Sequence, residues 1–329
     1  MKRQSPLGEF ILEILPTLSG IRYRTRKYAI GINGRMSELF INDSPVKVMN
    51  KDWDNLVILD ACRYDMFSDN NWIDGELSKV TSLGSSTGEF LQKNFRSSHH
   101  YDTVYITANP HLQIIPDTFY SVFDLVHDDR YWDQELLTVP PRRVTSVAKD
   151  VFNNHQDKRL IIHYMQPHYP FIGPKGRALD IDGGVIGHID KSPDAETVEG
   201  EWSEFAEYDP KNFWSQLSKA SSETLQQALD AYQENLRYVL EEVEDLVEFL
   251  PGKTVITSDH GNMVGERQFP IPVRGFGHPS RTHIPSLVTV PWLELEYESR
   301  RSISAEEPVH SSKPDPDVMK DRLASLGYL

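Results

Sequence analysis

The sequence predicts an α/β fold in which a mainly parallel sheet is sandwiched between helices. Short apolar runs that suit buried strands alternate along the chain with segments of helical periodicity. The strand-like runs cover residues 55–59, 158–164 and 253–257, and the helical segments cover residues 87–95 and 223–250. Within the long helix, apolar residues recur every three or four positions, which indicates a face packed on the sheet. We expect residues 160–164 to form a central strand.

The domain organisation follows from length and composition. At 329 residues with 39% hydrophobic residues, the chain can bury a sizeable core in one or two α/β domains. We expect a helical and basic N-terminal extension over residues 1–50 and one α/β domain over residues 51–329. Residues 172–221 are rich in Gly, Asp and Trp and lack periodicity, which predicts a loop-rich insertion that caps a cleft.

The N-terminal extension begins with apolar residues at helical spacing, and a basic run follows at residues 22–27. This pattern is typical of a helix packed on the domain, and the alternative is peripheral contact of residues 1–30 with an anionic membrane surface. No stretch approaches the ~20 apolar residues of a membrane span. Two glutamates interrupt the first apolar patch, so a signal peptide is not expected.

The composition limits the classes of partner. The net charge is −15, which argues against a nucleic-acid binder because phosphate backbones repel an acidic surface. An anionic substrate must therefore be attracted locally, by a cation, an arginine or a histidine. The single cysteine, Cys62, excludes an intramolecular disulfide, which fits a reducing compartment, and we expect a cytoplasmic protein.

The first strand, residues 55–59, is followed directly by Asp60. A carboxylate at the carboxyl end of a strand in an open α/β sheet is a frequent metal or phosphate position. The alternative for Asp60 is an N-cap of the next helix. Arg63, about one turn further on, is a candidate to fork onto a substrate oxyanion, and a surface ion pair with Asp65 is the alternative.

A turn of small residues opens the helix at residues 87–95. Ser86 or Thr87 in such a position is ordinarily a capping residue. The functional interpretation is a hydroxyl nucleophile. Free backbone N–H groups at a helix N-terminus favour an incoming phosphate or sulfate, and a bound cation lowers the pKa of the hydroxyl.

The strand at residues 253–257 leads into Asp259, His260 and Gly261. A carboxylate and an imidazole on adjacent residues suit a divalent cation such as zinc or manganese. Asp-His-Gly alone is a common loop tripeptide, but in this chain a second strand also ends in an aspartate. We expect the two strand ends to lie at the same edge of the sheet.

These segments, in this order, resemble the alkaline phosphatase superfamily, and within it the sulfatase-like branch. The resemblance spans roughly residues 50–329, and its strongest motif is Ser-Asp-His-Gly at residues 258–261 combined with the early Asp60. The matching stretches are residues 59–65, the Thr87 turn, and residues 163–170, 258–261, 277–279, 284–288 and 322–329.

The resemblance implies one divalent metal ion (zinc, manganese or calcium) held by Asp60, Thr87, Asp259 and His260. It also implies that Thr87 is the nucleophile that takes up a phosphoryl or sulfuryl group. Glu89 stands where the family usually has proline after its nucleophile, so Ser86 remains a competitor for that role.

The resemblance further implies that His168 and His278 contact the transferred group or protonate the leaving group. His283 precedes the closing segment and is the alternative to His278. Seven other histidines, among them His111, lie in mostly polar surroundings, which is typical of surface residues.

Two departures from the family narrow the expected chemistry. The turn at residues 85–90 lacks the Cys/Ser-x-Pro-x-Arg signature that sulfatases modify, and Cys62 lies on another segment, so true sulfatase activity is not expected. Two-metal members carry Asp-x-x-x-His where this chain has Met-Gln-Pro-His at residues 165–168. This favours a single metal site, as in the lipid-headgroup phosphotransferases of the superfamily.

The expected function is metal-dependent hydrolysis or transfer of phosphate or sulfate esters through a covalent threonine intermediate. The expected substrate is an anionic small-molecule, glycan or lipid-headgroup ester. The alternative is a catalytically inactive relative that binds an anionic glycan or headgroup in its metal pocket. The presence of all four metal ligands favours the enzyme.

Overall fold

The computed structural model of the chain describes most residues between 25 and 309. The described residues are 25–181 apart from Lys27, Glu38, 40–43 and Pro116, then 184–185, 213–309, Val318, Arg322, Ser325 and Leu326. Residues 1–24 of the predicted N-terminal extension and residues 186–212 of the predicted cap lie outside this part. The predicted division of the chain at these two places stays a prediction.

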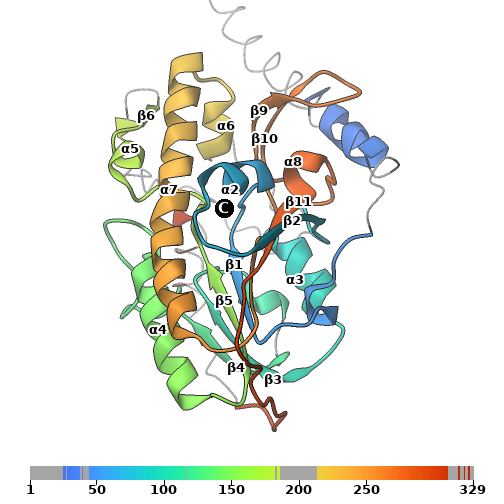
Figure 1. Cartoon of the computed structure of the whole chain (residues 1–329). Helices are drawn as coiled ribbons and strands as arrows, with labels where there is room; N and C mark the ends of the chain where they lie inside the picture. Colours follow the sequence, from blue (N-terminus) through green and yellow to red (C-terminus); the bar gives the residue numbers. More distant parts are fainter. Residues whose placement is uncertain are drawn as a thin grey trace, which may run out of the picture.

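A seven-stranded sheet forms the centre of the molecule (Figure 1). In spatial order its strands are β2 (Glu76–Thr81), β11 (Thr289–Glu294), β8 (Thr254–Thr257), β1 (Asn55–Leu59), β5 (Arg159–Tyr164), β3 (His100–Thr107) and β4 (Phe119–Asp124). The strands from β8 to β4 are parallel, and β11 runs antiparallel to both of its neighbours. The predicted mainly parallel sheet is confirmed, and β5 lies in its interior as expected.

Helices cover both faces of the sheet. They are α2 (Tyr64–Asn70), α3 (Thr87–Phe95), α4 (Pro141–Asn154), α5 (Pro174–Arg177), α6 (Phe213–Leu217), α7 (Ser222–Phe249) and α8 (Pro285–Val288), with short 3-10 turns η1 (Val48–Asn50) and η2 (Leu112–Ile114). The small hairpins are β6 (Asp180–Ile181) with β7 (Gly184–Val185), and β9 (Met263–Arg267) with β10 (Arg274–Gly277). Residues 28–37 form a further helix. Among the described helices, none is both long and apolar enough to cross a bilayer.

Two apolar layers form because successive residues of a strand point to opposite faces of the sheet. Val57 and Leu59 of β1 pack with α2, α4 and α7 on one face, and Leu56 and Ile58 pack with α3 on the other. Figure 1 shows α4 and α7 together across the first face. Every residue of β1 is buried, so both faces of this strand are apolar and its sequence does not alternate.

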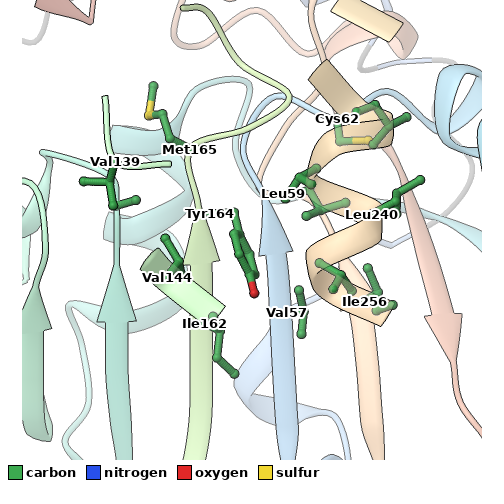
Figure 2. Packing of buried hydrophobic residues seen from close by; sticks show 14 of the residues in the cluster. Val57, Leu59, Cys62, Val139, Val144, Ile162, Tyr164, Met165, Leu240 and Ile256 are labelled. Atoms are coloured by element: carbon green, nitrogen blue, oxygen red, sulfur yellow. The ribbon is translucent and has the colours of Figure 1, made fainter. Parts of the chain in front are cut away.

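The long helix α7 anchors the first layer. Ser221 caps its N-terminus by accepting a hydrogen bond from the Thr224 backbone N–H at 3.1 Å. Its apolar stripe lies on the sheet, and Figure 2 shows Leu240 in the same buried layer as Leu59 and Ile256. A leucine that is fully buried in this way contributes about 2 kcal/mol to folding. The helices predicted at residues 87–95 and 223–250 are therefore confirmed as α3 and α7.

Candidate active site

The carboxyl ends of β1 and β8 meet at one edge of the sheet and bring Asp60 and Asp259 together. The two strands are parallel neighbours, and Ile58 is in register with Thr257. Both carboxylates are fully buried, and so is the ring of His260. The prediction that the two strand ends share an edge is confirmed.

Asp60, Asp259 and His260 form a compact group, which we call the acidic cluster. One ligand atom from each lies within 4.8 Å of the others. His260 Nε2 is 3.4 Å from Asp259 Oδ2 and 3.8 Å from Asp60 Oδ1. Its Nδ1 donates a hydrogen bond to the Gly261 carbonyl at 2.7 Å, so in the neutral ring Nε2 directs its lone pair at the carboxylates. This arrangement suits a cation between the three side chains.

The electrostatics of the acidic cluster lead to the same conclusion. Burial, followed by the charge of Asp259, raises the pKa of Asp60 well above its usual range. Asp60 Oδ1 and Asp259 Oδ2 are buried and accept no hydrogen bond from the described residues. Two buried carboxylates with unused oxygens are unfavourable unless a cation or a proton lies between them. The donor set therefore fits a divalent metal ion.

The turn after β1 is held in place by β8 and α7. Ala61 has a positive φ of 56°, an uncommon conformation for a residue with a side chain. Its backbone N–H donates to Asp259 Oδ1 at 3.0 Å, and the Cys62 N–H donates to Ser258 Oγ at 2.9 Å. The Tyr232 hydroxyl of α7 donates to the Ala61 carbonyl. These bonds fix the backbone that follows Asp60, and with it the direction of the Asp60 side chain.

Thr87, the first residue of α3, points into the acidic cluster. Its Oγ1 lies 3.2 Å from His260 Nε2 and 3.4 Å from Asp60 Oδ2. Ser86 points elsewhere, because its Oγ lies 2.7 Å from Ser280 Oγ. The four side chains that the family resemblance assigned to one cation therefore converge, and Thr87 is the hydroxyl that joins them.

Asn109 also belongs to the site, although the sequence analysis missed it. It follows β3, and its Nδ2 donates to Asp60 Oδ2 at 2.5 Å and lies 3.4 Å from Thr87 Oγ1. His111 Nδ1 lies 2.9 Å from Asn109 Oδ1, which orients the amide. His111 was expected at the surface but is partly buried beside the site, and burial lowers its pKa to about 4. Like Asp60, Asn109 is a polar residue just beyond the carboxyl end of a strand, so the same sequence pattern could have identified it.

His163 in β5 is a second residue that the sequence analysis gave no role. Its Nε2 lies 3.8 Å from Asp60 Oδ2 and 3.9 Å from Asp259 Oδ2, and its Nδ1 lies 2.7 Å from the Tyr105 hydroxyl. Burial lowers the pKa of His163 to about 4. A neutral imidazole therefore borders the acidic cluster from within the sheet. In the sequence it lies inside an apolar run, where it resembles an ordinary core residue.

His168 and His278 form a pair beside the acidic cluster. Their Nε2 atoms are 2.9 Å apart, and the ring centroids of His278 and His260 are 4.6 Å apart. His168 Nδ1 lies 2.5 Å from the Tyr169 carbonyl oxygen, which can only accept, so Nδ1 carries the proton of the neutral ring. His168 Nε2 is then an acceptor, and in the neutral pair His278 donates to it through Nε2. Burial lowers the pKa of His168 to about 4 and that of His278 well below its usual value. Both predicted histidines therefore lie at the site.

Arg63 and His283 are directed away from the acidic cluster. Arg63 donates through Nε and Nη2 to Asp65 at 2.8 and 2.6 Å, and through Nη1 to Glu266 at 2.5 Å. The ion pair with Asp65, which was the alternative for Arg63, is present, and a contact with substrate stays a prediction. His283 Nε2 lies 2.8 Å from Glu89 Oε1.

Glu89 connects the turn before α3 to the segment 279–283. Its carboxylate accepts hydrogen bonds from the backbone N–H and the hydroxyl of Ser85, both at 2.9 Å, and from Lys93 Nζ at 2.6 Å. Burial alone would raise the pKa of Glu89, but the hydrogen bonds from His283 and Lys93 outweigh it and hold the pKa below the usual range. Hydrogen bonds thus hold this turn, which has no proline to make it rigid.

We expect Glu89→Gln to lower the free energy of unfolding by about 3 kcal/mol at neutral pH, because a buried, paired carboxylate is lost. The folded pKa lies below the ordinary value of 4.5, so the contribution of the charge is complete above pH 4.5 and shrinks as the pH falls below it. Urea denaturation of both proteins across this pH range measures the difference. A difference that does not change with pH would show that the charge contributes nothing.

Comparison with solved structures found several distant matches. The soluble domain of lipooligosaccharide phosphoethanolamine transferase A from Neisseria meningitidis is 14% identical, with a TM-score of 0.43 over 73% of this chain and 75% of that chain. The C-terminal periplasmic domain of EcEptC from Escherichia coli, in complex with Zn, is 15% identical, with a TM-score of 0.42 over 76% of this chain and 77% of that chain. The 2-O GAG sulfatase BT1596 is 13% identical, with a TM-score of 0.43 over 78% and 65%. No protein-family model and no curated protein sequence matches the chain. The first of these three proteins is named as a phosphoethanolamine transferase and the third as a sulfatase.

Proposed function

We propose that this protein is a metal-dependent hydrolase or transferase that acts on phosphate or sulfate esters through a covalent intermediate on Thr87. The observation that carries the proposal is the direction of the Thr87 hydroxyl. It leaves the N-terminus of α3 and enters a buried group of two carboxylates and one imidazole. A threonine that served only as a helix cap would direct its oxygen at the backbone of its own helix.

The residues that would hold the metal ion are Asp60, Thr87, Asp259 and His260. Three oxygens and one imidazole nitrogen are suitable ligands for zinc or manganese, and the three oxygens can also coordinate calcium. When bound, a divalent cation supplies positive charge that lowers the pKa of a neighbouring hydroxyl and offsets charge on the ester. Among the described residues, the acidic cluster is the one group of carboxylate and imidazole side chains close enough together to hold a metal ion, which supports a single ion.

The side chains of the site then divide the chemistry between them. Thr87 Oγ1 attacks phosphorus or sulfur in line with the leaving group, so that the new Oγ1 bond forms as the ester bond breaks. Backbone N–H groups in the first turn of α3 and the Asn109 amide, 3.4 Å from Oγ1, stabilise charge on the transferred group. Water then releases the group in a hydrolase, or an acceptor alcohol receives it in a transferase, and the Thr87 hydroxyl is restored.

The proton balance assigns a role to His168 and His278. The hydroxyl proton leaves Thr87, and the departing alkoxide must take up one proton. Burial keeps both rings neutral in the absence of substrate, but an ester anion beside the pair favours a protonated imidazole. The pair can therefore carry the proton between the nucleophile and the leaving group.

The proposed substrate is an anionic glycan or lipid-headgroup ester or a small-molecule ester, and a panel of chromogenic esters tests the reaction class. Purified protein is treated with a chelator and assayed with p-nitrophenyl phosphate, bis(p-nitrophenyl) phosphate and p-nitrophenyl sulfate, with zinc, manganese or calcium added back. We expect turnover of a phosphate ester that depends on the added ion. Metal binding without turnover of any ester would support the alternative, a binding protein without catalytic activity. The cytoplasmic location expected from composition stays a prediction.

A further inference from the structure

A tyrosine and a histidine on neighbouring strands form a buried pair next to the acidic cluster. Tyr105 lies in β3 and His163 in β5, and neither side chain is exposed. The two strands are parallel and Thr107 is in register with His163, so Tyr105 lies two residues earlier on the same face of the sheet. The Tyr105 hydroxyl lies 2.7 Å from His163 Nδ1. The Tyr105 ring is stacked on Phe119, with ring centroids 5.0 Å apart, and this packing holds the hydroxyl in place.

The other ring nitrogen of His163 faces the two carboxylates of the acidic cluster. His163 Nε2 is buried and has no hydrogen-bond partner among the described residues. It lies 3.8 Å from Asp60 Oδ2 and 3.9 Å from Asp259 Oδ2. Buried polar atoms without a partner are rare in folded proteins. A shift of about 1 Å would bring Nε2 within hydrogen-bond distance of either carboxylate.

The neighbours of the neutral His163 ring decide which of its nitrogens carries the proton. Burial raises the pKa of Tyr105, so its hydroxyl keeps its proton and can donate to Nδ1. The ring proton is then on Nε2, where an N–H attracts the two carboxylates, whereas a lone pair would repel them. His260 has the opposite tautomer, because its Nδ1 donates to the Gly261 carbonyl. His260 can therefore bind a cation, and His163 can donate to the carboxylates that bind it.

We propose that His163 is a positioning residue of the metal site, which donates its Nε2–H to Asp60 Oδ2 and is itself oriented by Tyr105. This role rests on the proposed function, because it requires that Asp60 holds the ion. Asp60 Oδ2 already accepts a hydrogen bond from Asn109 at 2.5 Å, whereas Oδ1 accepts none from the described residues. A second donor at Oδ2 fixes the carboxylate so that Oδ1 stays directed toward His260 Nε2, 3.8 Å away, and the ion.

Zinc titration of the chelated protein tests the role of His163. His163→Leu removes the donor but keeps an apolar side chain in the sheet, and we expect the zinc affinity, measured by isothermal titration, to fall about 10- to 100-fold. His163→Gln carries a side-chain N–H that can reach the position of Nε2, so it should recover most of the lost affinity. Recovery by glutamine distinguishes a donated hydrogen bond from a role in packing, because leucine would serve packing better.

Tyr105→Phe tests how the His163 ring is oriented, and Tyr164→Phe is its matched control. Tyr164 is equally buried, and its hydroxyl lies 2.8 Å from Thr145 Oγ1 in the layer on the other face of the sheet (Figure 2). Each substitution removes one buried hydroxyl and its hydrogen bond, so both should lower the midpoint of thermal unfolding to a similar extent. Only Tyr105→Phe should weaken zinc binding, by about tenfold, because His163 Nδ1 loses its donor.

Nuclear magnetic resonance of the ring nitrogens gives a readout that needs no metal. In chelated, isotope-labelled wild type, we expect the His163 ring, assigned by the loss of its signals in His163→Gln, to carry its proton on Nε2. A proton on Nδ1, or zinc affinity that is unchanged in both His163→Leu and Tyr105→Phe, would overturn this inference and leave the metal site in place. Absence of zinc binding by the wild type would instead overturn the proposed function, and the role of His163 with it.

Discussion

Replacing Thr87 with alanine is expected to lower turnover by at least about a thousandfold while the protein still binds its metal ion. The substitution removes the attacking oxygen, whereas Asp60, Asp259 and His260 remain as ligands. Steady-state assays at saturating metal measure the first effect, and metal analysis of the purified protein measures the second. Acid-quenched wild type should gain the mass of one phosphoryl or sulfuryl group, and the variant should not.

Ser86→Ala is the matched control for this experiment. Ser86 is the neighbouring hydroxyl, but its Oγ pairs with Ser280 at 2.7 Å and makes no capping bond to α3. We expect its turnover to stay within about tenfold of the wild type, since one such hydrogen bond is worth roughly 1 kcal/mol. Wild-type rates in Thr87→Ala would exclude the covalent mechanism at this residue. A large loss in Ser86→Ala alone would move the nucleophile to that position.

Asp259→Asn is expected to abolish both metal binding and turnover. The amide keeps an oxygen that can accept from the Ala61 and His260 N–H groups, at 3.0 and 2.8 Å in the wild type, so the loop can retain its shape. The substitution removes the negative charge that attracts a cation, so the affinity for metal should fall by more than about a hundredfold. Isothermal titration of the chelated protein with zinc or manganese measures this loss.

Thermal unfolding separates this effect from a general loss of structure. The wild type should gain about 2.7 kcal/mol of stability when metal is added at a hundred times its dissociation constant, and Asp259→Asn should gain none. Without metal, the variant should unfold at a temperature close to that of the wild type. The substitution removes the repulsion that, after burial, raises the pKa of Asp60, but it also removes the attraction of Asp259 to His260 and His163, which holds the pKa of Asp259 below its usual value despite burial.

Asp54→Asn is the control, an equally buried carboxylate at the start of β1 that pairs with Arg300. It should lower stability and leave metal binding intact. Stabilisation of Asp259→Asn by metal equal to that of the wild type would contradict the proposed site.

The two aspartates and the elements that carry them could be predicted from the sequence because they depend on local patterns. Apolar runs at residues 55–59 and 253–257 have the length and composition of buried strands, and the polar residues that follow mark where each strand ends. Parallel strands then place those residues at one edge. Helical periodicity is local too, and α3 and α7 have bounds within a residue of those predicted.

The tertiary structure alone decided between neighbouring candidates, because their directions depend on partners far away in the chain. Ser86 turns toward Ser280 and His283 toward Glu89, each pair 194 residues apart in sequence, and these contacts leave Thr87 at the acidic cluster. His163 shows the same limit. A histidine inside an apolar run has the same local sequence pattern whether it fills a core or borders two carboxylates. Only the pairing of β5 with β1 places His163 beside the acidic cluster.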